Sequence, residues 1–342
     1  MKKKSSLKDI AKKVGVSIAT VSYVMNNKEK EARVGEDVAA RIRKAALQLD
    51  YKPNFIAKSL KSGKTNTIGL IVADISNPFF STLARIIEDE ARKHGYIVLF
   101  GSSDEKTENL QSLIEVFINR QVDAFIIAPT ADAESQIKFI QEAQIPVVLI
   151  DRYFPNLPTD VVRIDNEVAA FNAVRHLLAL GRKKIGMVAY KTTLPHMKAR
   201  IDGYKKALKN AGIRLNASHI VKADYQQLTK EVGDGVAKLL RNSEKIDALF
   251  FATNTLAVAG LKKIVELNIK VPEDLAIVSF DESEAFDFFY SPITYMRQSM
   301  KDIGKESVAL VIKKLGKKLN KSETIIVDAH LVQRDSCGIN LP

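Results

Sequence analysis

From Thr67 onward, short runs rich in β-branched residues alternate with amphipathic segments, and this alternation limits the fold more than any other feature of the chain. The runs are IGLIVAD, IVLFGSS, DAFIIAP and PVVLID, and helical spacing of apolar residues begins between them at Pro78 and near Leu110. Strands joined by helices pair in parallel, because each helix carries the chain back to the same end of the sheet. The sequence therefore predicts an α/β core with a doubly wound parallel sheet that helices cover on both faces.

A second series of the same kind begins near Val168, with the runs KIGMVAY, DALFFAT and LAIVSFD. A chain of 342 residues has room for two or three compact units, so we expect two doubly wound parallel-sheet subdomains within residues 66–342. We assign residues 66–163 and 295–323 to the first subdomain and residues 164–294 and 324–342 to the second, which requires three crossings between them. A ligand is expected where the strand ends of the two subdomains face each other.

Excess positive charge is concentrated in the first fifth of the chain. Residues 1–65 hold 16 Lys and Arg against 6 Asp and Glu, which accounts for +10 of the net charge of +12. A basic segment taken alone is usually a solvated face. On a small folded head, however, this charge is typical of a module that binds nucleic-acid phosphates.

Residues 7–26, LKDIAKKVGVSIATVSYVMN, have the pattern of two short helices joined by a tight turn. Gly15 allows the positive φ that the turn needs, Ala11 is small where the helices cross, and the Ser17 hydroxyl can cap the second helix. An ordinary helical hairpin has the same spacing, but the basic charge favours a helix-turn-helix. We expect this all-α DNA-binding head to span residues 1–53, with a third helix from about Gly35 to Leu49.

This stretch resembles the head of the lactose repressor and galactose repressor family. The resemblance implies that the second helix enters the major groove of double-stranded operator DNA. Its exposed face would consist of Ile18, Ala19, Ser22, Tyr23 and Asn26, while Ser17 and Thr20 would reach phosphates. Many family members have an arginine where Tyr23 stands, so the bidentate contact from arginine to guanine is missing from this helix.

Residues 54–65 have the pattern of a short amphipathic linker, and a helix of this length is marginal in water by itself. The segment resembles the hinge helix of the same family, which folds on DNA and inserts a leucine into the minor groove. Leu60 matches that leucine and Ala57 the small residue beside it, and Asn54 belongs to the same DNA-binding set. Such an apolar wedge unstacks a base step and bends the duplex.

The loops after the expected strands carry carboxylates, amides, arginines and aromatic rings. They are Asp74, Asn77, Phe79, Phe80, Asp151, Arg152, Arg200, Tyr225, Asn254, Asp281 and Gln298. Taken singly, such an Asp is more often a helix cap, and such a Phe is more often a core residue. Together they suit a polyhydroxylated ring, because carboxylates and amides bind paired hydroxyls and aromatic rings cover C–H faces.

The same positions resemble those of periplasmic ribose-type binding proteins and of the matching repressor cores. That resemblance implies a sugar or sugar-derivative effector, with Phe79, Phe80 and Tyr225 as stacking walls and the polar side chains as ligands. Where the family usually has Asn-Asp, this chain has Asn254-Thr255, and Thr255 can cap the helix without adding a charge. His196, close to Arg200 in sequence, is expected in a solvent-exposed loop.

The common catalytic and metal-binding motifs are missing from the sequence. It has no GxxxxGK[ST], GxGxxG, HExxH or GxSxG, and its five histidines share no metal-ligand spacing, so we expect no enzyme activity, cofactor or metal. Asp151 and Asp281 could form the acid and base of a glycoside hydrolase, but the adjacent Arg152 favours carboxylates of low pKa. The single cysteine, Cys337, excludes an intrachain disulfide.

No apolar run is long enough for a secretory signal or a membrane span, which favours a cytoplasmic protein. The alternative is a periplasmic-type sugar receptor, which shares the expected core but not the basic head. The family resemblance extends from Leu7 to a terminal strand, TIIVDAHLVQRDS. It implies a transcriptional regulator of the repressor type that acts as a homodimer, because one head makes too few base contacts for a specific site. The sequence leaves open whether the effector releases or strengthens DNA binding.

Overall fold

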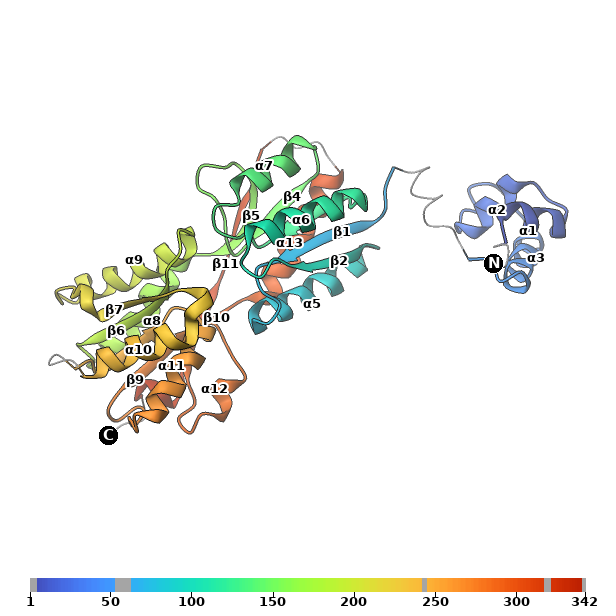
Figure 1. Cartoon of the computed structure of the whole chain (residues 1–342). Helices are drawn as coiled ribbons and strands as arrows, with labels where there is room; N and C mark the ends of the chain where they lie inside the picture. Colours follow the sequence, from blue (N-terminus) through green and yellow to red (C-terminus); the bar gives the residue numbers. More distant parts are fainter. Residues whose placement is uncertain (1–4, 53–62, 242–244, 317–320, 340–342) are drawn as a thin grey trace. The chain divides into compact units, whose positions relative to one another are not determined.

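The computed structural model describes residues 5–52, 63–241, 245–316 and 321–339 (Figure 1). The chain divides into two compact units, Met1–Thr65 and Asn66–Pro342. The second unit begins where the sequence predicts that the core begins. The expected hinge residues Asn54, Ala57 and Leu60 lie outside the described residues.

Three helices form the described part of the first unit: α1 (Leu7–Val14), α2 (Ile18–Met25) and α3 (Glu36–Gln48). Their shared core includes Ile10 and Val21, both fully buried. Gly15 ends α1 with a φ of 75°, and Ser17 caps α2 by accepting a hydrogen bond from the Thr20 amide at 3.0 Å. The predicted helix-turn-helix and third helix are therefore confirmed.

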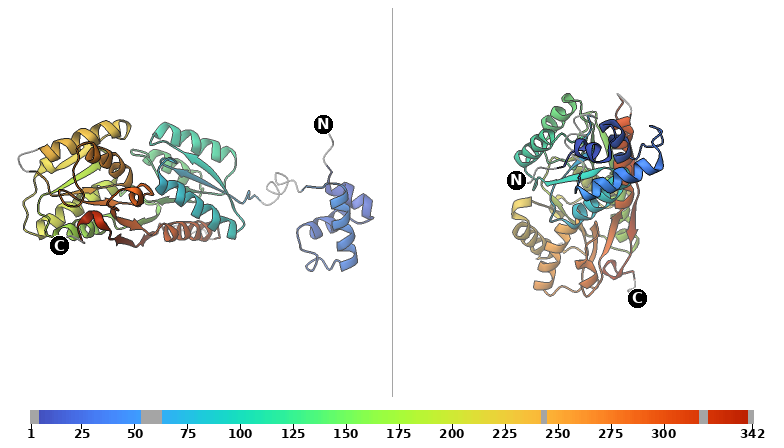
Figure 2. Two further views of the ribbon diagram at one scale, coloured as in Figure 1. Left: turned by 90° about the horizontal axis from the view of Figure 1, so that it is seen from below. Right: turned by 90° about the vertical axis from the view of Figure 1, so that its right-hand side faces the viewer.

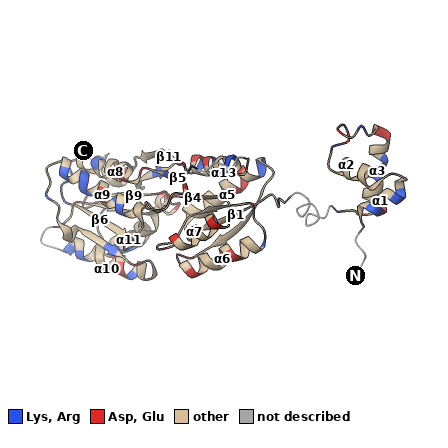
Figure 3. Cartoon of the chain, turned by 90° about the horizontal axis from the view of Figure 1, so that it is seen from above, with Lys and Arg blue, Asp and Glu red and all other residues tan. Residues whose placement is uncertain are grey.

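The first core sheet has six strands within the described residues, all parallel, in the order β11-β5-β4-β3-β1-β2. Its strands are β1 (Thr67–Val72), β2 (Ile97–Ser102), β3 (Ala124–Ile127), β4 (Val147–Ile150), β5 (Asp160–Ile164) and β11 (Thr324–Val327). Helices α5 (Pro78–Lys93) and α13 (Met300–Gly316) cover one face, and α6 (Thr107–Asn119) and α7 (Glu134–Glu142) cover the other. Charges of both signs are mixed along the exposed side of α5, as in the ion pair between Arg92 and Glu88 (Figure 3).

The second core sheet also has six strands within the described residues, in the order β12-β10-β9-β8-β6-β7, with only β12 antiparallel. Its strands are β6 (Ile185–Tyr190), β7 (Ile220–Ala223), β8 (Ala248–Phe251), β9 (Ala276–Phe280), β10 (Thr294–Gln298) and β12 (Ala329–Val332). Helices α8 (Asn166–Ala179) and α9 (Pro195–Asn210) cover one face, and α10 (Leu228–Arg241) and α11 (Asn254–Glu266) cover the other. The two sheets occupy separate lobes of the core (Figure 2), as the two series of strands predict.

The chain crosses between the sheets three times in its described part, but the last two crossings differ from the expected boundaries. Strand β10 pairs with β9 and β12, so residues 295–298 belong to the second subdomain rather than the first. The expected terminal strand is two strands, because β11 pairs with β5 of the first sheet and β12 with β10 of the second. Pairing between strands far apart in sequence decides which sheet each strand joins, and local sequence patterns do not indicate this pairing.

None of the described helices is both long and apolar enough to cross a bilayer.

The contact between α8 and α9 depends on Gly203. A Cβ atom there would lie 2.3 Å from the Glu167 carbonyl oxygen and 2.9 Å from the Phe171 amide nitrogen, both backbone atoms that cannot give way cheaply. Gly233 of α10 is the matched control, since the nearest atom to its added Cβ is the Lys263 Cε at 3.7 Å.

We predict that Gly203→Ala lowers the free energy of unfolding by about 1–3 kcal/mol, because the helices must separate. Gly233→Ala should raise it by roughly 0.5–1 kcal/mol, because alanine loses less backbone entropy in a helix. Urea unfolding of the full chain measures both. Equal stability of the Gly203→Ala variant and the wild type would show that the helices are not in close contact.

Candidate functional site

Two aspartates stand at corresponding places in the two core sheets. Asp151 directly follows β4 and Asp281 directly follows β9, with φ values of 64° and 65°. Asp tolerates this left-handed conformation better than most residues. The conformation turns the chain sharply at the end of each strand. Both residues are buried, with 5% and 7% of their surface exposed.

Arg200 lies between these carboxylates and is 2% exposed. It stands in α9, and its guanidinium donates from Nε to Asn166 Oδ1 at 2.8 Å and from Nη1 to the Ala252 carbonyl oxygen at 2.7 Å. The guanidinium carbon also lies 3.6 Å from the centre of the Phe280 ring, a cation–π contact. A flat ring and two fixed acceptors thus hold the charge in one orientation.

Arg200 forms one ion pair within the second subdomain, with Asp281, and one across to the first subdomain, with Asp151. Its Nη1 atom lies 3.6 Å from Asp281 Oδ2, and its Nη2 atom lies 4.0 Å from Asp151 Oδ1. Burial raises the pKa of Asp281 to about 6, against the attraction of Arg200, and raises the pKa of Asp151 for the same reason. The expectation of low pKa values is therefore wrong, because burial outweighs the neighbouring arginines.

Arg152 has a tight partner that sequence reasoning missed. Its Nη1 and Nη2 atoms donate to the two carboxylate oxygens of Glu105, each at 2.7 Å. The ring of Phe80 lies 5.5 Å from its guanidinium carbon. Glu105 raises the pKa of Arg152 against the effect of burial, so this arginine is firmly charged and already paired.

His196 also belongs to this cluster, although an exposed loop was expected. Helix α9 begins at Pro195, so His196 lies one turn before Arg200 on the same inward side and is only 5% exposed. Burial, together with Arg152 and Arg200, holds its pKa well below the usual range. The imidazole is therefore neutral at physiological pH.

Further contacts between the subdomains come from residues after β1 and at the second sheet. The Asn254 amide donates to Asn77 Oδ1 at 3.3 Å, and the Tyr225 hydroxyl donates to the Asp74 carboxylate. Tyr225 opens a short 3₁₀ helix (Tyr225–Gln227). Partial burial of Tyr225 and the hydrogen bond that its hydroxyl donates to Asp74 raise the pKa of this hydroxyl.

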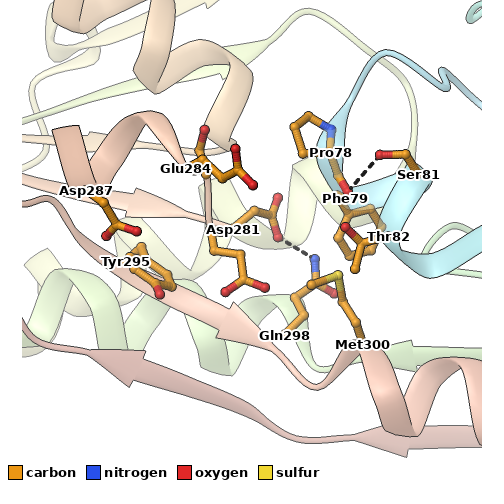
Figure 4. Close-up of a pocket in the computed structure, with 12 residues that line it drawn as sticks. Pro78, Phe79, Ser81, Thr82, Asp281, Glu284, Asp287, Tyr295, Gln298 and Met300 are labelled. Carbon is orange, nitrogen blue, oxygen red and sulfur yellow. Dashed lines mark hydrogen bonds between the residues drawn. The ribbon is translucent and has the colours of Figure 1, made fainter. Parts of the chain in front are cut away.

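A pocket of about 460 Å³ adjoins these residues and has walls from both subdomains (Figure 4). Its lining residues are Pro78, Phe79, Ser81, Thr82, Asp281, Glu282, Ser283, Glu284, Asp287, Tyr295, Gln298 and Met300. Within it the Gln298 amide donates to Asp281 Oδ1 at 2.7 Å (Figure 4). Phe79 lines this pocket, whereas Phe80 packs in the core of the first subdomain beneath Arg152.

Several buried polar atoms around Arg200 lack a hydrogen-bond partner within the described part of the chain. They are Asp151 Oδ1, Arg152 Nε, His196 Nδ1 and Gln298 Oε1. Buried polar atoms without partners are costly. A polar ligand between the subdomains would satisfy them, because it presents donors and acceptors to both sides.

No group of three or more His, Cys, Asp or Glu that could hold a metal occurs among the described residues.

The N-terminal cap of α11 differs from the expectation. Thr253, not Thr255, caps α11 by accepting from the Leu256 amide at 3.3 Å, because Asn254 is already the first helical residue. Thr255 instead donates to the Asn254 side chain at 3.2 Å.

The predicted DNA-binding side chains of the head lie on the outside of α2. Ile18 and Tyr23 are 48% and 45% exposed. The Ser17 hydroxyl contacts that of Thr20 at 2.8 Å. Ser17, Ala19 and Asn26 are also exposed, and Ser22 and Thr20 are half-buried.

Asn166, Phe280 and Glu105 hold the two arginines, and sequence reasoning assigned no role to any of them. Asn166 comes from α8 and Phe280 ends β9, so only the fold brings them to Arg200. Phe280 directly precedes Asp281 in sequence, which is the one local signal that could have drawn attention to it.

Two family models match the chain: bacterial regulatory proteins of the lacI family at residues 6–54, and the periplasmic binding protein-like domain at residues 174–337. The transcriptional repressor CytR of Escherichia coli K12 is 32% identical over 333 residues, covering 97% of this chain and 96% of CytR. Catabolite control protein A of Priestia megaterium is 34% identical over 328 residues, covering 95% of each chain. The structure of the lac repressor dimer bound to operator and the anti-inducer ONPF matches with a TM-score of 0.86 at 21% identity, covering 98% of this chain and 99% of that chain.

The raised pKa of Asp281 makes a testable prediction about stability. In the folded state its pKa is about 6 rather than the ordinary 3.8, so the folded state binds the proton more tightly. Protonated Asp281 therefore stabilises the folded state fully below pH 4, and this stabilisation is lost as the pH rises through 6. The free energy of unfolding of the wild type minus that of Asp281→Asn should fall between pH 4 and 6.5, by on the order of 3 kcal/mol.

Urea unfolding at a series of pH values measures this difference. Asp202→Asn, on the half-exposed part of α9, controls for the loss of one carboxylate. A difference that stays flat or rises with pH would contradict the placement of Asp281 in a buried site.

Proposed function

This chain belongs to the LacI family of bacterial regulatory proteins, which makes it a DNA-binding transcriptional regulator, and we propose that it is a repressor controlled by a sugar or sugar derivative bound between its core subdomains. The observation that carries the proposal is the position of Arg200. It contacts a carboxylate from each subdomain and is surrounded by polar atoms without partners.

The chemistry of the cluster suits a polyhydroxylated ligand. Asp151 and Asp281 offer carboxylate oxygens as acceptors, and Arg200, Asn254 and Gln298 offer N–H donors. A sugar hydroxyl both donates and accepts, so adjacent hydroxyls can bind a carboxylate and a guanidinium at the same time. The pocket of Figure 4 adds the ring of Phe79 as an apolar wall.

The proposed regulator binds operator DNA as a homodimer. A single α2 presents few side chains to base edges, and two heads on half-sites related by a dyad double that number. Leu60, with the small Ala57 beside it, would enter the minor groove at the centre of the operator, as the family resemblance implies. The sequence 54–65 would then connect effector binding to the spacing of the two heads.

Coupling between the two sites requires two arrangements of the core. The effector favours one of them through its contacts with both subdomains, and operator affinity changes by the coupling free energy, typically about 1–3 kcal/mol. The three crossings between the subdomains, after Ile164, Gln298 and Val327, are the places where the backbone can adjust. A glycoside hydrolase is disfavoured because the chain matches the lacI family of regulatory proteins, and the repressor CytR is similar to it over nearly its whole length.

The experiment has two steps on the full chain. A thermal-shift panel of sugars first selects the one that stabilises the protein most, since a ligand that binds the folded state raises the unfolding temperature. Calorimetric titration then compares the wild type, Arg200→Met and the exposed control Arg214→Met with that sugar. DNA affinity is measured by fluorescence anisotropy on promoter and random duplexes.

Arg200→Met should weaken sugar binding by about one to two decades, because a charge-assisted hydrogen bond in a buried site is worth roughly 1.5–3 kcal/mol. It should also abolish the effect of the sugar on promoter affinity, and Arg214→Met should change neither. Unchanged sugar affinity in Arg200→Met would place the effector elsewhere. Equal affinity of the wild type for promoter and random DNA would contradict the repressor function.

A further inference from the structure

We propose that Glu105 is a specificity-determining residue of the effector site. It occupies the anion-binding side of Arg152 and so restricts the site to effectors that carry no phosphate or carboxylate group. This inference rests on the proposed function, since it assumes that the effector binds beside Arg152 between the subdomains.

The contact between the two side chains is the kind that an anionic ligand would otherwise make. Both terminal nitrogens of Arg152 donate to Glu105 at 2.7 Å in a bidentate pair, and Nη1 also donates to the Pro129 carbonyl oxygen at 3.3 Å. Phosphates and carboxylates bind arginine through the same fork. The pair is largely shielded from water, with 10% of the Arg152 side chain and 19% of the Glu105 side chain exposed.

The loop that carries Glu105 is built to place this carboxylate. Asp104 and Glu105 have successive φ values of 52° and 57°, a left-handed conformation that costs free energy in residues other than glycine. It is held by a hydrogen bond from the Glu105 amide to the Ala73 carbonyl oxygen at 2.8 Å and by one from the Ser102 hydroxyl to Asp104 at 2.6 Å. These bonds hold the backbone that carries Glu105, and Arg152 holds its carboxylate.

The surroundings also disfavour an anion. Asp151 lies within ion-pair distance of both Arg152 and Arg200, and Asp281 within ion-pair distance of Arg200. The adjoining pocket adds Glu282, Glu284 and Asp287 to its walls. Of these, Glu282 pairs with Arg297 and Asp287 with Arg334. With Arg152 neutralised by Glu105, a phosphate would meet more carboxylates than cations.

The polar atoms left near Arg152 suit neutral groups. Arg152 Nε and His196 Nδ1 are buried without a hydrogen-bond partner among the described residues, and Asp151 Oδ1 is an acceptor in the same state. The N–H of Arg152, the neutral imidazole of His196 and the carboxylate oxygen of Asp151 can each form one hydrogen bond with a sugar hydroxyl, because a hydroxyl group can both donate and accept. The expected effector class is thus an unphosphorylated sugar without an acid group.

The test uses thermal shift and calorimetry on the full chain at constant ionic strength. The variants are the wild type, Glu105→Gln, and Glu105→Gln combined with Arg152→Met. The probes are inorganic phosphate, glucose and ribose, and glucose 6-phosphate and ribose 5-phosphate. All three proteins share the basic head, so phosphate binding by the double variant gives the background that is subtracted from the other two.

We expect Glu105→Gln to bind inorganic phosphate or a sugar phosphate at least tenfold more tightly than the wild type, and the double variant to lose this gain. The proposal is overturned if Glu105→Gln gains no phosphate affinity over the wild type. It is also overturned if the wild type binds a sugar phosphate more tightly than the matching neutral sugar, a result that does not depend on the folding of any variant.

The two proposals fail in distinguishable ways. If no sugar of either kind binds the wild type, the sugar effector is wrong, while the phosphate response of Glu105→Gln still decides whether Glu105 fills an anion site. If a neutral sugar binds and phosphate affinity is the same in all three proteins, the sugar effector stands and the role of Glu105 is wrong.

Discussion

The buried guanidinium of Arg200 is the interaction on which the arrangement of the core depends. A charge taken out of water is tolerated only where hydrogen bonds and opposite charges surround it. Here Asn166 and the Ala252 carbonyl oxygen fix its direction, and the Phe280 ring supports its flat side. Its ion partners stand at 3.6 and 4.0 Å, longer than direct charged hydrogen bonds, and they come from different subdomains. The cluster is therefore in place, but its charges and polar atoms are incompletely paired. A ligand that forms hydrogen bonds with both subdomains gains the most binding free energy at such a site.

Arg152 shows the opposite condition, and the contrast between the two arginines gives the site its selectivity. Its terminal nitrogens form a bidentate ion pair with Glu105, so the pair is neutral overall, whereas Arg200 still offers charge to a ligand. A site with one available arginine between two aspartates favours hydroxyl groups over anions.

Much of the fold and of the site could be predicted from the sequence. The features that could not be predicted all depend on contacts between residues far apart in the chain. Alternation of strands and helices gave both core sheets, and the position of Asp151 and Asp281 after strands indicated the site, because strand ends of parallel sheets meet at one edge. The spacing around Gly15 indicated the head. By contrast, the assignment of β10 and β11 to their sheets depends on pairing with distant strands. Glu105, Asn166 and the burial of His196 depend likewise on contacts far apart in sequence, and no local pattern distinguishes them from surface residues.

In the proposed mechanism, the site between the subdomains and the DNA-binding head are energetically coupled. Thermodynamic linkage requires that the effector change operator affinity by the same factor as the operator changes effector affinity. The most direct measurement is therefore calorimetric titration of the stabilising sugar into the full chain, free and saturated with its promoter duplex, beside anisotropy measurements of DNA affinity with and without the sugar. We predict equal factors in the two experiments, about 5- to 150-fold. Sugar affinity that is the same with and without bound DNA would show that the two sites are not coupled.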